Sequence, residues 1–113
     1  MKTKPLIEWQ DFDKIDIRTG TVVDVTDFEK ASKPAYKLYI DFGELGIRKT
    51  SAQITERYDK LDLVGNQVMA VVNFPPKQIA DFMSECLVLG VYTKTGVVLI
   101  TTTEKTADGL ALG

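Results

Sequence analysis

The stretch of sequence that decides the fold is YKLYIDF, at residues 36–42. Large apolar residues occupy every second position, and Lys37, Tyr39 and Asp41 stand between them. This is the period-two pattern of a strand with one buried face. GELG follows at residues 43–46 and is typical of a tight connection between antiparallel strands. The sequence therefore predicts a hairpin between 36–42 and a returning strand over 47–54.

The segments on either side of this hairpin are also strand-like. Four aliphatic residues before it share one parity, namely Ile15, Ile17, Val23 and Val25. Gly20 interrupts that run and predicts a bulge or a sharp bend. After the hairpin, VMAVV at 68–72 is typical of a strand buried on both faces, and 87–91 and 97–100 flank a second turn, TKTG at 93–96.

Two short helical pieces are predicted between these strands. Thr55 is a candidate N-cap for a helical turn over 55–58. Ile79, Phe82 and Met83 have the spacing of one apolar helix face, which predicts a short helix within 77–84. With five or six short strands and no long amphipathic helix, the pattern favours an all-β fold. We expect a small closed or nearly closed barrel, in a single domain over residues 1–113.

The composition excludes the commonest catalytic chemistries. The chain has no histidine and a single cysteine, Cys86, so it cannot form a Ser–His–Asp triad, a Cys–His dyad, a His-ligated metal site or an internal disulfide. Cys86 opens an apolar run, which indicates a buried, inert thiol. Asp11, Asp13 and Asp16 are interpreted as a solubilising rim. The sequence therefore predicts no enzyme activity, no cofactor and no metal site.

The charges are few but unevenly placed. The net charge is −2 and the sequence pI is about 5.1, which argues against binding nucleic acid through bulk charge alone. Residues 28–60 nevertheless carry a net charge of +2, while both flanks carry −2. Because no stretch approaches the ~18 apolar residues of a spanning helix, we expect a cytoplasmic protein with no membrane insertion.

Cations and polar side chains of the predicted hairpin gather as a binding surface would require. Pairing of the two strands brings lysines of 33–37 near Arg48 and Lys49, interleaved with Tyr39, Ser51 and Gln53. Such groups pair with phosphates, stack on bases and read their edges. The loop NFPPKQ at 73–78 is rigid and presents Asn73, Lys77 and Gln78, or it ends one strand and begins a helix.

Several blocks of the sequence resemble a known family. DIRTGTV at 16–22 and KPAYKLYIDFG at 33–43 resemble the free-standing tRNA-binding domain family, which includes modules appended to methionyl-tRNA synthetases. The later blocks are similar to the CsaA-like branch of that family. They are SAQIT at 51–55, VVNFPPKQIA at 71–80, MSE at 83–85 and LVLG at 87–90.

This resemblance implies an OB-fold barrel of five strands with short N- and C-terminal extensions, assembled as a homodimer. Asp81 stands where the family often has glycine, and we expect it to place a negative charge beside Lys77. By motif, the ligand-contacting surface would comprise Lys33, Lys37, Arg48, Lys49, Ser51, Gln53, Asn73, Phe74, Lys77, Gln78 and Ser84.

The two ends of the chain carry apolar residues outside the predicted strands. Because a small barrel has open edges that need cover, these residues predict a homodimer; alternatively, they plug the ends of their own barrel. They are Leu6, Ile7, Trp9 and Phe12 at one end, and Leu110 and Leu112 at the other.

Two ligand classes remain open. The first is structured RNA, tRNA by resemblance, held by lysines with an affinity that falls steeply with salt. The second is an unfolded polypeptide held in an apolar pocket near Phe74, since the resemblance also implies a chaperone for export precursors that cooperates with the secretion motor. We favour tRNA binding as the molecular activity, with the chaperone role as its biological companion.

Overall fold

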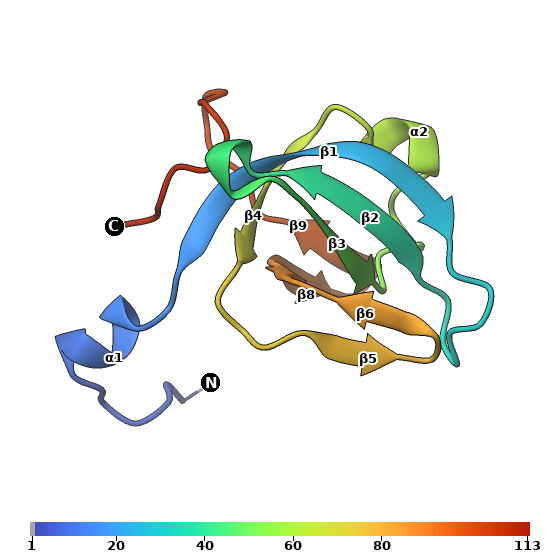
Figure 1. Ribbon diagram of the computed structural model, residues 1–113. Coiled ribbons are helices and arrows are strands. Elements are labelled where there is room, and N and C mark those ends of the chain that lie inside the picture. The colour runs from blue at the N-terminus through green and yellow to red at the C-terminus, as the bar shows by residue number, and fades with distance from the viewer. Residues whose placement is uncertain (1) are drawn as a thin grey trace.

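Five strands form one antiparallel sheet in the structure, a computed structural model that describes residues 2–113 (Figure 1). The spatial order of the strands is β3-β2-β1-β4-β7. Their bounds are β1 Ile17–Asp27, β2 Tyr36–Asp41, β3 Ile47–Ala52, β4 Gln67–Val71 and β7 Leu87–Val88. The all-β expectation is confirmed.

Two small hairpins and a few helical turns complete the described chain. The β5–β6 hairpin follows β4 and lies along β3, and the β8–β9 hairpin follows β7 (Figure 1). These elements are α1 Trp9–Asp13, the 3₁₀ turn η1 Gly43–Leu45, α2 Lys60–Leu63, β5 Lys77–Ile79, β6 Phe82–Ser84, β8 Gly90–Thr93 and β9 Gly96–Leu99.

The alternation that decided the fold also builds the core. Leu38, Ile40 and Phe42 are completely buried, while the residues between them lie on the outer face. Val22 of β1 and Val68 of β4 belong to the same cluster. A sheet with one apolar face must curl or be covered, and here it curls so that the apolar face becomes the barrel interior.

The barrel is closed by a seam between β3 and residues 84–86, which begin at the last residue of β6. Glu85 N donates to Lys49 O at 2.8 Å, and Lys49 N donates to the Glu85 carboxylate at 3.0 Å. Thr50 Oγ1 donates to Cys86 O at 2.8 Å, and Ser51 N donates to Ser84 Oγ at 2.9 Å. The result is the nearly closed, OB-fold-like barrel that the sequence and the family resemblance predicted.

Gly20 is required for a different reason from the one predicted. The register shift of β1 against β2 lies between Val22 and Asp24, whereas Gly20 pairs regularly with Val68. A Cβ at Gly20 would lie 2.6 Å from Ile40 Cγ2 and 2.7 Å from the Phe42 ring. The position needs glycine because core side chains already occupy the space that a side chain would fill.

The helix predicted over 77–84 is wrong, because this segment is the β5–β6 hairpin. Ile79 pairs with Phe82 across a two-residue turn in which Ala80 adopts a φ of +52°. A spacing of three residues brings two side chains together on a helix, and it does so equally well across such a turn. Both apolar residues pack on a satellite cluster formed by Phe28 and Ala35.

The predicted cap at Thr55 is also wrong. Residues 55–57 form a turn, and helix α2 begins only after Asp59. The Asp62 side chain accepts a hydrogen bond from Asp59 N at 3.3 Å. The spacing of Asp59 and Asp62 is that of a capping box, with an acidic side chain at each position, and was the stronger helix-start signal.

The two chain extensions lie on the same side of the barrel (Figure 1). The C-terminal segment adds to β1 where β2 has not yet begun to pair, through Thr19 N to Leu110 O at 3.0 Å and Leu112 N to Ile17 O at 2.8 Å. The N-terminal segment with α1 projects away from the barrel. Among the described residues, no helix has the length and apolar character that crossing a membrane requires.

The packing at Gly20 leads to a stability prediction. We expect Gly20→Ala to lower the free energy of unfolding by about 1–3 kcal/mol, because Ile40 and Phe42 must move to admit a methyl group. Urea unfolding followed by circular dichroism measures the change. Gly113→Ala is the control, since no atom lies within 4 Å of the added Cβ there. Equal midpoints for the two variants would contradict this explanation.

Candidate functional site

Lys37 and Lys49 come together on the outer face of the β2–β3 hairpin. In the strand register Tyr39 lies opposite Lys49, and Lys37 lies opposite Ser51. All four residues therefore share the face that is turned away from the barrel interior. We call these four residues the lysine face.

Aromatic rings hold the two lysines of this face. Lys37 Nζ lies 5.0 Å from the Phe28 ring centroid and 5.1 Å from that of Phe82, and Lys49 Nζ lies 5.1 Å from Phe82. These are cation–π distances, and they bring two ammonium groups to one ring. Sequence reasoning missed Phe82, because the segment was assigned to a helix and not to a strand beside β3.

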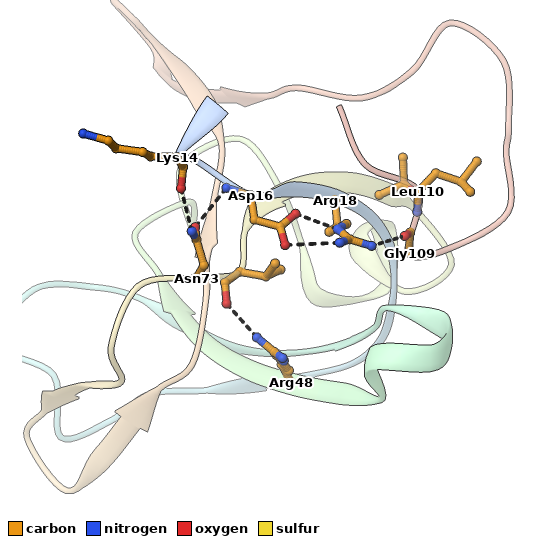
Figure 2. Close-up of polar contacts among 9 residues, drawn as sticks. Lys14, Asp16, Arg18, Arg48, Asn73, Gly109 and Leu110 are labelled. Carbon is orange, nitrogen blue, oxygen red and sulfur yellow. Dashed lines mark hydrogen bonds and ion pairs between the residues drawn. The ribbon is translucent and has the colours of Figure 1, made fainter. Parts of the chain in front are cut away.

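Arg48 does not belong to the lysine face. It lies opposite Ile40, a core residue, so its side chain starts from the inner face of β3. Its Nη1 donates to Val72 O at 2.7 Å (Figure 2). The alternation of side chains along a strand, applied to 48 and 49, would have separated the two cations from the sequence alone.

Asn73 is engaged in internal hydrogen bonds. Its Oδ1 accepts from Asp16 N at 2.9 Å, and its Nδ2 donates to Lys14 O at 2.7 Å (Figure 2). Its side-chain amide therefore fastens the base of the N-terminal segment to the end of β4. A predicted ligand contact thus has a structural role in the described chain.

Arg18 fastens the other extension. Its Nε donates to the Asp16 carboxylate at 2.6 Å, and its Nη1 donates to Gly109 O at 3.0 Å (Figure 2). The hydrogen bond to Asp16 raises the pKa of Arg18 above its usual value. Both extensions are therefore held at their bases by neighbouring polar groups, since Asp16 also binds Asn73 through its backbone.

A groove opens beside the lysine face, with a volume of about 1280 Å³. Its walls come from the end of β3, the β5–β6 hairpin with the loop before it, and the β8–β9 hairpin. Six of the predicted site residues line it, namely Lys33, Ser51, Gln53, Phe74, Lys77 and Ser84. It also contains Glu56, Tyr92 and Lys94, which sequence reasoning did not single out.

The remaining polar residues of the β5–β6 hairpin are internally paired. Gln78 Nε2 donates to Ala80 O at 3.1 Å, within the hairpin itself. Asp81 was expected to act on Lys77, but its carboxylate pairs with Lys30 at 3.0 Å. The hydrogen bond from Lys30 lowers the pKa of Asp81 below its usual value. The charge of Asp81 is thus balanced by the loop before β2, because the hairpin tip lies against that loop.

Cys86 is a buried residue of the core cluster. Burial raises the pKa of its thiol to about 12. The thiolate, which is the reactive form, is therefore scarce at neutral pH, as expected for an inert structural thiol.

Comparison with known proteins shows which family the chain resembles in sequence and structure. The sequence model of a family described as "Putative tRNA binding domain" matches residues 17–110. The crystal structure of the CsaA chaperone protein from Picrophilus torridus is similar, with 50% identity, a TM-score of 0.92, and coverage of 96% of this chain and 100% of that one. Chaperone CsaA from Bacillus anthracis gives 46% identity, a TM-score of 0.91 and the same coverage.

A more distant relative is an enzyme of which the chain matches only a part. The methionine–tRNA ligase of Chlorobium phaeovibrioides is 36% identical over 96 residues, which is 85% of this chain. The match spans only 13% of the length of that ligase. The chain therefore corresponds to a small part of this relative.

The hydrogen bonds of Asn73 predict how the N-terminal segment is held. We expect trypsin to cleave after Lys14 roughly fivefold faster in Asn73→Ala, because the variant loses bonds to Lys14 O and Asp16 N. Mass spectrometry of timed digests measures the rate. Gln78→Ala is the matched control, since it loses only a bond within its own hairpin. Equal cleavage in the wild type and in Asn73→Ala would refute this role.

Proposed function

The chain belongs to the tRNA-binding domain family and is CsaA-like, and from that premise we propose that it is a non-catalytic protein that binds tRNA or another structured RNA. The observation that carries the proposal is the lysine face, where two ammonium groups are held against one aromatic ring. The groove beside it, with Lys33 and Lys77, extends the cationic surface. We further propose that the protein works in the cytoplasm, where tRNA is found.

The charges of the lysine face suit a polyanion. Within residues 2–113, the ion pairs engage Lys14, Arg18, Lys30 and Lys60, and none engages Lys37 or Lys49. Both lysines can therefore pair with phosphates without breaking an internal ion pair. The rings beneath them fix the ammonium positions, which lowers the entropic cost of binding.

This proposal predicts a charge-dependent affinity for tRNA. We expect Lys49→Glu to weaken binding about tenfold or more at low salt, because the variant neutralises fewer phosphates of the tRNA than the wild type does. The difference between the two should shrink as salt rises, since salt weakens each of these charge contacts. Titrations at several salt concentrations give the affinity and the slope of its logarithm. Lys105→Glu is the control, because it makes the same charge change on the C-terminal segment and not on the lysine face. The neighbouring residue, Thr106, donates its backbone N–H to the Gln67 side chain of β4. An equal loss in both variants, or no binding by the wild type at low salt, would contradict the proposal.

We also propose that two copies form a homodimer through the chain extensions. Leu6 and Trp9 are 101% and 84% exposed, so they do not plug the end of their own barrel. Leu110 and Leu112, each about half exposed, lie on the extension that leaves the barrel on the same side (Figure 1). Large apolar groups gathered at one side of a molecule are typical of an interface with another copy or a partner.

The dimer has a direct test. We expect the wild type to sediment at micromolar concentration as twice the 12.6 kDa chain mass, and Trp9→Glu to shift it towards the monomer. The reason is that a buried, unpaired carboxylate is costly at an apolar contact. Leu61→Glu, on exposed helix α2, is the control for adding a charge elsewhere. A wild type that stays monomeric would refute the dimer.

A second candidate function is a chaperone for unfolded polypeptides, such as export precursors delivered to the secretion motor. The observation that favours it is the apolar part of the groove, where Phe74 is 53% and Leu87 49% exposed. Two similar solved structures are CsaA chaperones by name. In this case burial of apolar side chains would hold the polypeptide, and its affinity would depend little on salt.

The chaperone candidate predicts a different mutational pattern. We expect Phe74→Ala to weaken the binding of an unfolded peptide several-fold at high salt, while Lys49→Glu changes it little, because apolar contact supplies the affinity. Fluorescence anisotropy of a labelled peptide measures both. Met83→Ala is the control, since Met83 is 40% exposed but lies outside the groove. Peptide binding that is lost in Lys49→Glu and kept in Phe74→Ala would rule out this candidate.

A further inference from the structure

We propose that the groove beside the lysine face binds an unpaired strand of RNA, with bases stacked on Phe74 and Tyr92. The preferred ligand is then a structured RNA that carries a single-stranded segment next to a duplex. This inference rests on the proposed RNA binding and adds to it the class of RNA and a second contact surface.

The charges along the groove favour a polyanion. Lys33, Lys77 and Lys94 line it, and Glu56 is the one carboxylate among its lining residues. None of these lysines takes part in an ion pair in the described part of the chain. An extended strand carries one phosphate per nucleotide, so it offers several anionic groups to these cations. A polypeptide without many acidic residues would leave these cations unmatched.

The aromatic residues of the groove are placed for stacking. Phe74 comes from the loop before β5 and is 53% exposed, and Tyr92 comes from β8 and is 93% exposed. Core aromatics of this protein are buried, as Phe42 and Phe82 show. A flat ring left largely open to water is a platform on which a base can stack, and such contacts accept any base.

Both rings are mounted on stiff supports. Pro75 and Pro76 follow Phe74 and restrict the backbone of its loop. Tyr92 pairs with Val97 in the β8–β9 hairpin, whose turn is closed by Thr93 Oγ1 donating to Gly96 O at 2.6 Å. Because both loops are already ordered in the free protein, binding costs little conformational entropy. Most of the stacking energy can therefore contribute to the affinity.

The groove is continuous with the lysine face. Ser51 belongs to that face, opposite Lys37, and it also lines the groove. Ser84, whose Oγ accepts from Ser51 N, lines the groove as well and pairs with Lys77 across the β5–β6 hairpin. A strand that leaves a duplex held by Lys37 and Lys49 therefore enters the groove directly. Side-chain hydroxyls and the amide of Gln53 lie there as partners for base edges.

Three RNA probes with one common stem test the inference. The first is a blunt hairpin, the second adds a six-nucleotide unpaired tail with 2-aminopurine, and the third has the same tail without bases. We expect the tailed hairpin to bind the wild type about tenfold more tightly than the blunt one, with quenching of 2-aminopurine. The abasic tail should recover only the small part of this gain that its phosphates supply.

The variants separate stacking from charge. We expect Phe74→Leu and Tyr92→Leu to lose most of the gain from the tail, which is measured in each variant as the ratio of its affinities for the tailed and the blunt hairpin. Tyr92→Phe keeps the ring and should keep the gain. Lys94→Glu should reduce the gain for both tails, because it removes a phosphate contact in the groove and none on the lysine face.

The outcomes distinguish the two levels of the proposal. A wild type that binds none of the three probes at low salt overturns the RNA function and this inference together. A wild type that binds the blunt and tailed hairpins equally overturns the inference alone. A gain from the tail that Phe74→Leu and Tyr92→Leu both keep also overturns the inference, because the tail then binds outside the groove. An unfolded peptide that these two variants no longer bind would in that case assign the groove to polypeptide.

Discussion

The partial closure of the barrel is the constraint on which the rest of the structure depends. Three consecutive residues of β3, Lys49 to Ser51, make five hydrogen bonds to the segment 84–86, and three of the five use a side chain of that segment in place of its backbone. Such a seam joins the strands only over this short length. Beyond it, β3 ends at Ala52 and residues 51–55 line the groove. The same feature therefore completes the core and leaves an opening where a ligand can enter.

Most of the barrel could be predicted from the sequence, because one-sided burial leaves a period-two pattern that any reader can find. The pattern over 36–42 gave the correct buried residues, Leu38, Ile40 and Phe42. The prediction from sequence failed at 77–84. There the spacing of Ile79 and Phe82 fits one face of a helix and the two sides of a two-residue turn equally well. What decides between them is the satellite cluster around Phe28, a contact far away in the chain that no local pattern contains.

The candidate site was predictable as a region and less so as a set of roles. The lysines were found through the excess of positive charge in residues 28–60 and the family resemblance, and the Phe74 loop through its two prolines and the same resemblance. Arg48 and Lys49, adjacent in the chain, lie on opposite faces of β3, which parity alone could have shown. The role of Asn73 was hidden, because its partners Lys14 and Asp16 come from another part of the chain and meet it only in the fold.

An acidic protein can bind a polyanion when its cations are not neutralised evenly. In the described chain, ion pairs take up Lys14, Arg18, Lys30 and Lys60. The lysines left without a carboxylate partner include all five along the seam and groove, namely Lys33, Lys37, Lys49, Lys77 and Lys94. Since charges interact strongly only within a Debye length of about 8–10 Å, a ligand at this site interacts with these five lysines and with the few carboxylates beside them, Glu56 and Glu85, more than with the net charge of −2. The rest of the surface carries an excess of negative charge and repels a polyanion. The overall negative charge therefore disfavours non-specific binding over the whole surface, and the local group of lysines favours binding at this one site.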